Sequence, residues 1–116
     1  MSADQLSHTL SAIADPTRRA ILARLALGET SVNELAAPFE MSLPAVTKHI
    51  KVLQRAGLIS QTRQAQSRPC KLEAKPLQEV AAFLAQYHQF WEQRLDQLDS
   101  YLLSLNVKEN ENDRIV

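Results

Sequence analysis

The chain has 116 residues, of which 45% are hydrophobic, and this is enough for one domain with a core of its own. A single cysteine excludes an internal disulfide framework, and only two glycines leave no room for a glycine-rich phosphate loop. The sequence has neither a signal peptide nor a run of about twenty apolar residues, so we expect a soluble, cytoplasmic protein with no membrane partner.

The formal net charge of zero is an average over two segments of opposite charge. Residues 43–75 hold seven basic side chains and one acidic one, whereas residues 76–116 hold three basic and seven acidic ones. Neutrality of the whole chain would argue against nucleic acid as a partner, but a segment of net charge +6 argues for it.

Two helices are predicted before Gly28. Apolar residues recur at helical spacing over residues 5–14, and Asp15 with Pro16 then ends this segment and caps the next. The second helix should supply core side chains, namely Ile21, Leu22, Leu25 and Leu27. Its three arginines should be solvated, and two of them, Arg18 and Arg19, are within reach of a phosphate in this interpretation.

Residues 31–58 have the pattern of a helix-turn-helix. Ser31 followed three residues later by Glu34 predicts a capping box at the first helix. Ser42 predicts the N-cap of the second helix, which tolerates a proline in its first turn and ends at Gly57. The sequence therefore predicts two short helices joined by a tight turn.

The second of these helices has an apolar face and a basic face. The apolar face consists of Val46, Ile50 and Leu53, and the opposite face carries Pro44, Lys48, Lys51 and Arg55. Such a helix suits the major groove of DNA, because its basic side can meet phosphates and base edges. The alternative is an ordinary helix pair with a solvated basic face.

A β-hairpin is predicted directly after this helix. Residues 58–63 and 70–75 alternate between two faces, and the residues between them form a short loop. Pro69 restricts its strand to an edge or a bulge, and Arg63 and Arg68 flank the hairpin tip. A hairpin in this place is a wing that reaches the DNA backbone or the minor groove. The candidate DNA-binding residues are Ser42, Leu43, Pro44, Ala45, Thr47, Lys48, His49, Lys51, Arg55, Arg63 and Arg68.

The last predicted helix starts at Pro76 and carries an apolar heptad repeat over residues 77–105. The repeat consists of Leu77, Leu84, Trp91, Leu98 and Leu105, with Ala81, His88, Leu95 and Leu102 four residues after each of the first four. A helix of about 43 Å is longer than one small domain needs, so one side of it requires a partner. The alternative is a long helix folded wholly onto its own domain. The candidate dimerisation residues are Leu6, Leu10, Ile13, Leu84, His88, Trp91, Leu95, Leu98 and Leu102.

Together these segments resemble a known family. The run DPTRRAILARL at 15–25, the run from SVNEL to AGLI at 31–59, the hairpin and the long last helix are similar to the arsenic-repressor type (ArsR/SmtB) of bacterial winged-helix regulators, over roughly residues 6–105. The resemblance implies a homodimer that binds a palindromic operator in double-stranded DNA and represses transcription until a signal releases it. Autorepression would be expected for such a regulator.

The resemblance does not extend to the metal sites of that family. One such site uses a Cys-x-Cys pattern in the helix before the recognition helix, and residues 34–40 contain no cysteine. Another uses paired histidines and acids on the last helix, where this chain has only His88 with Glu92 and Asp96 on its face. Cys70 lies among apolar residues and should be inert. We expect no metal, no cofactor, and an effector that is either not a metal or absent.

The predicted fold is mainly α with a small β-hairpin: a winged helix-turn-helix of about five helices plus a two-stranded wing. Residues 1–105 should form the DNA-binding and dimerisation domain, and residues 106–116 a disordered tail. No catalytic residues are predicted, because His8, His49 and His88 are scattered and form no triad pattern. The alternatives are a winged-helix protein-interaction module and a small-molecule sensor with a pocket between the last helix and the core.

Overall fold

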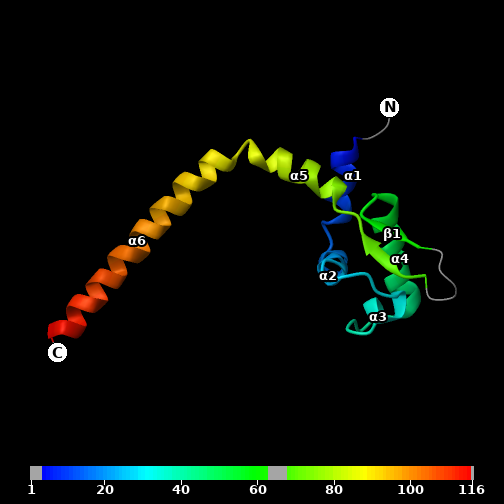
Figure 1. The fold of residues 1–116 in the computed structure, drawn as a ribbon, viewed down its shortest axis with the longest axis horizontal. Helices are drawn as coiled ribbons and strands as arrows, with labels where there is room; N and C mark the ends of the chain where they lie inside the picture. Colours follow the sequence, from blue (N-terminus) through cyan, green and yellow to red (C-terminus); the bar gives the residue numbers. More distant parts are fainter. Residues whose placement is uncertain (1–3, 63–67, 116) are drawn as a thin grey trace. The chain divides into compact units, whose positions relative to one another are not determined.

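The computed structural model describes residues 4–62 and 68–115, and the side chains of these residues as far as residue 106 (Figure 1). This described part contains six helices and one two-stranded antiparallel sheet. The elements are α1 (Gln5–Ala12), α2 (Pro16–Leu25), α3 (Val32–Ala36), α4 (Leu43–Arg55), β1 (Ile59–Gln61), β2 (Cys70–Leu72), α5 (Lys75–Ala85) and α6 (His88–Ile115). This is the predicted winged helix-turn-helix.

The chain divides into two compact units. Met1–Ala81 form the N-terminal unit, and Ala82–Val116 form the C-terminal unit. The N-terminal unit contains α1 to α4 and the hairpin, and the C-terminal unit contains α6. None of the helices in the described part is long and apolar enough to cross a membrane.

Side-chain caps start the first four helices, as the sequence predicts for three of them. The Asp15 carboxylate accepts from the Arg18 N–H at 3.0 Å, and Ser42 Oγ accepts from the Ala45 N–H at 3.3 Å. At α3, Ser31 Oγ accepts from the backbone N–H three residues later at 3.2 Å. Asp4, which we did not single out, caps α1 in the same way.

The predicted capping box at α3 is only half formed. Glu34 supplies its backbone N–H to Ser31, but its carboxylate accepts a short hydrogen bond from the Thr30 hydroxyl and lies 3.7 Å from Arg24. The Glu34 carboxylate therefore interacts with Thr30 and with Arg24 of α2. It does not make the bond to the N-cap N–H that would complete the capping box.

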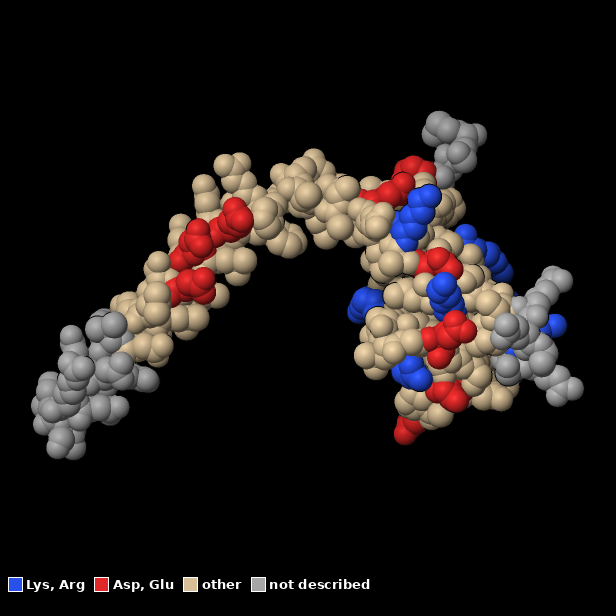
Figure 2. Space-filling model, viewed as in Figure 1, with Lys and Arg blue, Asp and Glu red and all other residues tan. Residues whose placement is uncertain are grey.

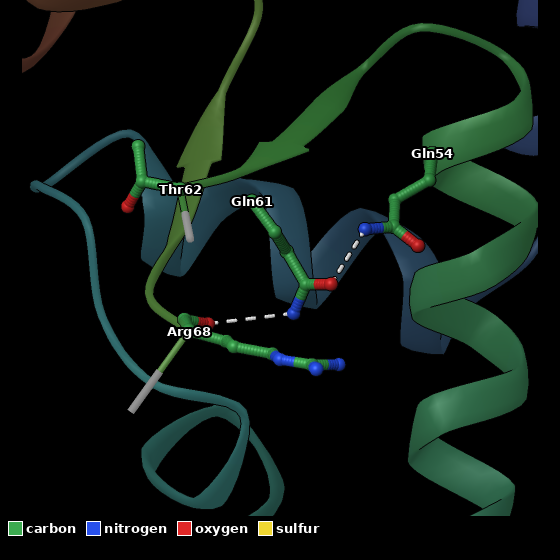
Figure 3. Close-up of a pocket in the computed structure, with 4 residues that line it drawn as sticks. All are labelled: Gln54, Gln61, Thr62 and Arg68. Atoms are coloured by element: carbon green, nitrogen blue, oxygen red, sulfur yellow. Dashed lines mark hydrogen bonds between the residues drawn. The ribbon is translucent and has the colours of Figure 1, made fainter. Parts of the chain in front are cut away.

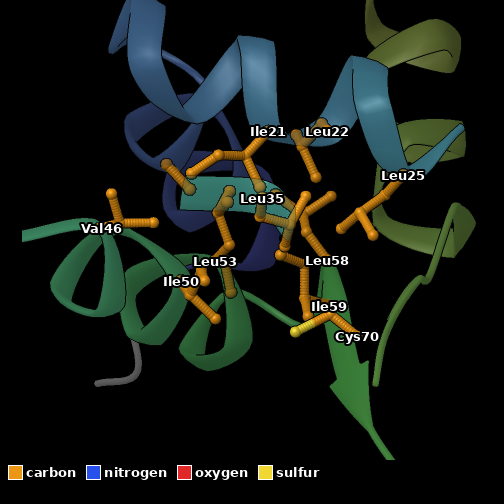
Figure 4. Close-up of a cluster of buried hydrophobic side chains, with 12 residues drawn as sticks. Ile21, Leu22, Leu25, Leu35, Val46, Ile50, Leu53, Leu58, Ile59 and Cys70 are labelled. Carbon is orange, nitrogen blue, oxygen red and sulfur yellow. The ribbon is translucent and has the colours of Figure 1, made fainter. Parts of the chain in front are cut away.

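A single apolar cluster holds the N-terminal unit together (Figure 4). Val46, Ile50 and Leu53 lie in it, which confirms the predicted inner face of α4. The other buried members are Ala12, Ile21, Leu22, Leu25, Leu35, Ala56, Leu58, Ile59 and Cys70. Leu27 was expected in the core but is 83% exposed, because α2 ends at Leu25 and the following turn points it outward.

The hairpin pairs Ile59 with Leu72 and Gln61 with Cys70, so the wing has the predicted strands, each three residues long. Pro69 lies just outside β2, where its carbonyl oxygen accepts from the Thr62 N–H at 3.2 Å. A further backbone bridge, which we did not predict, joins Thr30 to Cys70 by two hydrogen bonds of 3.1 and 2.7 Å. The chain before α3 is thereby fixed to the wing.

The prediction of one continuous last helix is wrong, because α5 ends at Ala85 and α6 begins at His88. In an unbroken helix the Tyr87 N–H would donate to the carbonyl oxygen of Phe83. Here it donates to the Leu84 carbonyl at 3.0 Å, and the Gln86 side-chain amide donates to Phe83 O at 2.9 Å. A side-chain donor thus replaces the helical bond, and this break explains why the described part has six helices.

The backbone of α6 is helical to Ile115 and so includes most of residues 106–116. The disorder that we expect for this tail stays a prediction, as does the domain boundary at residue 105. The first residues of the chain and the hairpin tip at residues 63–67 lie outside the described part.

Candidate nucleic-acid interface

The outer face of α4 presents most of the candidate DNA-binding residues. Ser42, Leu43, Pro44, Lys48, Lys51 and Arg55 are exposed, and Ala45, Thr47 and His49 are half-buried. The Thr47 hydroxyl donates to the Leu43 carbonyl at 2.9 Å, so its proton is used within the helix. Thr47 can therefore offer a partner only its methyl group and its acceptor lone pairs.

Lys48 and Lys51 do not have the same surroundings, although both are exposed. Lys51 lines a groove of about 620 Å³ with Thr47 and Gln54 of α4. Leu43 and Ile50 of α4 also line it, and the rest of the lining comes from the start of α3 and from the hairpin: Ser31, Val32, Asn33, Gln61 and Arg68. Lys48 is not among the residues that line this groove. The two lysines that the sequence placed on one face are therefore suited to different contacts.

Two glutamines join α4 to the wing (Figure 3). Gln54 Nε2 donates to Gln61 Oε1 at 2.9 Å, and Gln61 Nε2 lies 3.4 Å from the Arg68 carbonyl oxygen. These residues and Thr62 line a second groove of about 520 Å³. Arg68 has a φ of 38°, which is uncommon for a residue other than glycine. The bond from Gln61 helps to hold this backbone conformation beside α4.

Sequence reasoning missed Gln54 and Gln61. Both are polar residues beside the predicted apolar faces, and this position is the only signal that could have identified them. Arg63, which we expected on the other side of the tip, lies outside the described residues.

The exposed basic side chains of this region are free to meet phosphates. Within the described residues, none of Lys48, Lys51, Arg55, Arg68 and Lys71 forms an ion pair with a carboxylate. Figure 2 shows Lys and Arg side chains, mixed with acidic ones, on the visible face of the N-terminal unit. On the described part of α6 the same view shows acidic side chains. The interface therefore combines unpaired positive charge with a rigidly packed helix, which is what a helix in the major groove requires.

The two arginines of the DPTRR segment form hydrogen bonds with carbonyl groups of the same chain. Arg18 donates from Nε to the Ala12 carbonyl at 2.6 Å and from Nη2 to the Ser11 carbonyl at 3.2 Å. Arg19 donates to the Ile13 carbonyl at 2.9 Å. Both therefore bind carbonyl groups at the C-terminal end of α1, where the helix dipole favours positive charge. These hydrogen bonds give both arginines a role in the fold, so a contact with phosphate is not needed to account for them.

His49 of α4 lies beside the same cluster. Its Nδ1 is 3.2 Å from Arg18 Nη1 and 3.9 Å from the Asp15 carboxylate, and 24% of its side chain is exposed. The backbone N–H of Arg18 lowers the pKa of Asp15, although partial burial opposes this, so Asp15 is ionised at neutral pH. The start of α2 and α4 are thus connected through side chains.

The candidate dimerisation residues divide into two groups. On α5 and α6, the large apolar members are all exposed: Leu84, Trp91, Leu95, Leu98 and Leu102. Near the N-terminus, Leu10 is exposed, Leu6 is half-buried, and Ile13 packs against the core of its own unit. In this single chain His88 is exposed, and its Nε2 lies 2.9 Å from Glu92.

The residues considered for metal or redox chemistry are His88, Glu92, Asp96 and Cys70. In the described part of the chain, no group of three or more His, Cys, Asp or Glu side chains could hold a metal ion. Cys70 is a free, fully buried thiol, and burial raises its pKa, with a smaller opposite effect from the hydrogen bond of Gln61. The thiolate, which is the reactive form, is therefore disfavoured.

Comparisons with known proteins agree with this geometry. A family model described as a helix-turn-helix domain matches residues 13–62. The HTH-type transcriptional regulator Rv2034 of Mycobacterium tuberculosis is 40% identical over 84 residues, which are 72% of this chain and 76% of the relative. The transcriptional repressor SdpR of Bacillus subtilis is 36% identical over 61 residues, which are 53% of this chain and 68% of the relative.

A solved structure is similar over most of the fold. The crystal structure of an ArsR family transcriptional regulator is 45% identical, has a TM-score of 0.70, and covers 77% of this chain and 98% of its own. Its match in sequence and in fold agrees with the helix-turn-helix match and with the wing described above. The chain belongs to the ArsR family of winged helix-turn-helix transcriptional regulators.

Proposed function

We propose that the protein is a dimeric, sequence-specific repressor that binds a palindromic operator. The observation that carries this proposal is the basic outer face of α4, which is unpaired with carboxylates within the described residues and fixed on a buried apolar face. The name of the Bacillus subtilis relative, a transcriptional repressor, supports the direction of regulation. A role in the cytoplasm follows from the DNA partner, and no catalytic role is part of the proposal.

The groove that Lys51 lines suggests distinct roles for the candidate residues. Lys48, outside the groove, contacts phosphate, whereas Lys51 reaches base edges together with Ala45 and Thr47 at the start of α4. Arg55 and Arg68 bind phosphate or the minor groove from the flanks. Arg63 keeps the same role on the basis of its sequence position alone.

Dimer formation is supported by the surface of α6. Five large apolar side chains of the heptad repeat are exposed along one helix, and a single small domain seldom leaves such a surface uncovered. A two-fold axis would place two copies of α4 on successive major grooves, about 34–36 Å apart. This geometry is the reason for proposing a palindrome.

The effector of the proposed repressor is either not a metal or absent. The described residues gather no metal-binding set, and Cys70 is buried in the core. We propose that the gene of the protein is among its own targets. The genes next to the remaining sites would indicate the signal.

The test starts by recovering the genomic DNA fragments that the purified protein binds, and then measures affinity for one of them over a salt series. A repressor that neutralises several phosphates gives a steep fall of log K with log salt. Lys48→Ala should lower this slope by about one for each chain of the dimer, and Lys51→Ala should cost about 1–3 kcal/mol at one base pair of each half-site. Arg24→Ala on α2 is the matched charge control and should change neither quantity.

A flat salt dependence would contradict the proposal and favour a protein-interaction module, because only phosphate binding releases counterions. Unchanged affinity and slope in both lysine variants would show that α4 is not the recognition helix. An apolar ligand that releases the DNA would favour the small-molecule sensor.

A further inference from the structure

Arg18 makes contacts that link three elements of the N-terminal unit. Its guanidinium donates to the carbonyl groups of Ser11 and Ala12 at the end of α1, while its backbone N–H is capped by Asp15 at the start of α2. The remaining nitrogen, Nη1, lies 3.2 Å from Nδ1 of His49 on α4. Among the side-chain hydrogen bonds of the described residues, no other charged group contacts both α1 and α4.

The contact between Arg18 and His49 defines the chemistry of the imidazole ring. A guanidinium has N–H donors and no acceptor, so His49 Nδ1 must accept the hydrogen bond with its lone pair. A neutral ring that accepts at Nδ1 carries its proton on Nε2. The ring therefore presents a donor, and not an acceptor, at its other edge.

We propose that Arg18 is a positioning residue for DNA binding: it holds His49 in the Nε2–H tautomer so that this N–H donates to a backbone phosphate of the operator. The proposal rests on the proposed function, and it assigns Arg18 an effect on affinity without any contact with DNA. It also links α1, which carries the candidate dimerisation residues Leu6 and Leu10, to the recognition helix.

The neighbouring arginine provides a matched control for this assignment. Arg19 has the same charge and also donates to a carbonyl group at the end of α1, at 2.9 Å from Ile13 O. Its side chain makes no hydrogen bond to α4 within the described residues. Arg18→Ala and Arg19→Ala therefore both remove one charge and part of the α1 cap, but only Arg18→Ala frees His49.

The experiment measures operator affinity over a salt series for the parent and for Arg18→Ala, Arg19→Ala, His49→Ala and His49→Gln. Arg18→Ala and His49→Ala should each weaken binding roughly tenfold, as expected for the loss of one hydrogen bond with a charged partner. The salt slope of Arg18→Ala should stay that of the parent, because in this proposal Arg18 touches no phosphate and displaces no counterion. Arg19→Ala should bind within about twofold of the parent.

His49→Gln separates positioning from simple structural support. Its amide nitrogen supplies a donor near the position of Nε2 and needs no partner to fix a tautomer, so it should restore most of the affinity that His49→Ala loses. In the His49→Gln background, Arg18→Ala should no longer weaken binding. Non-additivity of this kind is what a double-mutant cycle detects for two residues that act as one unit.

Three results of these measurements would contradict the proposed role of Arg18. A fall of the salt slope by about one per chain in Arg18→Ala would show that Arg18 itself contacts phosphate and would overturn it. If Arg18→Ala fails to fold in a thermal melt, unchanged affinity in a folded His49→Ala would overturn it instead. Failure of the parent to bind any operator would overturn the proposed function as well, whereas the other two outcomes leave that function intact.

Discussion

The two units of the molecule differ in how far their apolar side chains are exposed to solvent. In the N-terminal unit, apolar residues from α1 to α4 and the hairpin form one buried cluster (Figure 4). In the C-terminal unit, Trp91, Leu98 and Tyr101 are exposed, and so are the other large apolar side chains of α6 in its described part. The first unit completes its core from its own chain, and the second has the surface of a helix that needs a partner.

This difference assigns the two proposed tasks to different units. A helix that reads DNA must be held rigidly, and α4 is held by three buried side chains and by polar links to α2 and the wing. A helix that forms a dimer interface exposes apolar side chains in the single chain, and the large apolar side chains in the described part of α6 are exposed.

The largest effect is expected from a substitution in the core of the N-terminal unit. Leu53→Ala should lower the free energy of unfolding by about 2–5 kcal/mol, because Leu53 is fully buried and its truncation leaves a cavity. Urea unfolding at fixed protein concentration measures this quantity. Leu27→Ala is the control, and its effect should stay within about 0.5 kcal/mol because Leu27 is 83% exposed. A similar decrease in the free energy of unfolding in both variants would contradict the assignment of Leu53 to the core and of Leu27 to the surface.

The next effect concerns assembly. Trp91→Ala should weaken the dimer by about 2 kcal/mol or more, which is roughly a 30-fold higher Kd, because aromatic residues dominate interface energies. The far-UV spectrum and the unfolding of the N-terminal unit should be unchanged, since Trp91 lies outside its core. Leu103→Ala, at a position 65% exposed and outside the heptad repeat, is the control and should dimerise as the parent does. A Trp91→Ala protein that sediments as a tight dimer would refute this interface.

Local signals explain why much of the N-terminal unit could be predicted. The caps at Asp15, Ser31 and Ser42 depend on residues three positions apart, and the buried face of α4 depends on helical spacing alone. Such features need no knowledge of the rest of the chain. The alternation that predicted the wing is local in the same sense.

The features that could not be predicted depend on neighbours that are distant in sequence or on competition for one group. Arg18 and His49 are 31 residues apart, and the partner of each is visible only in the folded unit. At the break before α6, the Gln86 side chain donates to the Phe83 carbonyl oxygen that a continuous helix would use. A heptad repeat does not reveal such a break, because it records only where apolar residues lie.

The smallest effects are expected at the residues considered for signalling. Cys70→Ser should change operator affinity little, and the native thiol should react with iodoacetamide far more slowly than the unfolded one, since it is buried and its pKa is raised. Zinc, cadmium, arsenite and a chelator should each leave operator binding unchanged. A stoichiometric metal that releases the DNA, or labelling of native Cys70 at the unfolded rate, would contradict these expectations.

The most direct test of the division between the units is the mass of the protein on its operator, measured by sedimentation of the complex with a duplex that carries one genomic site. We predict two chains per duplex for the parent. Trp91→Ala should retain the DNA contacts of α4 but lose the two-chain complex at low micromolar concentration. One parent chain per duplex, or an unchanged two-chain complex with Trp91→Ala, would contradict it.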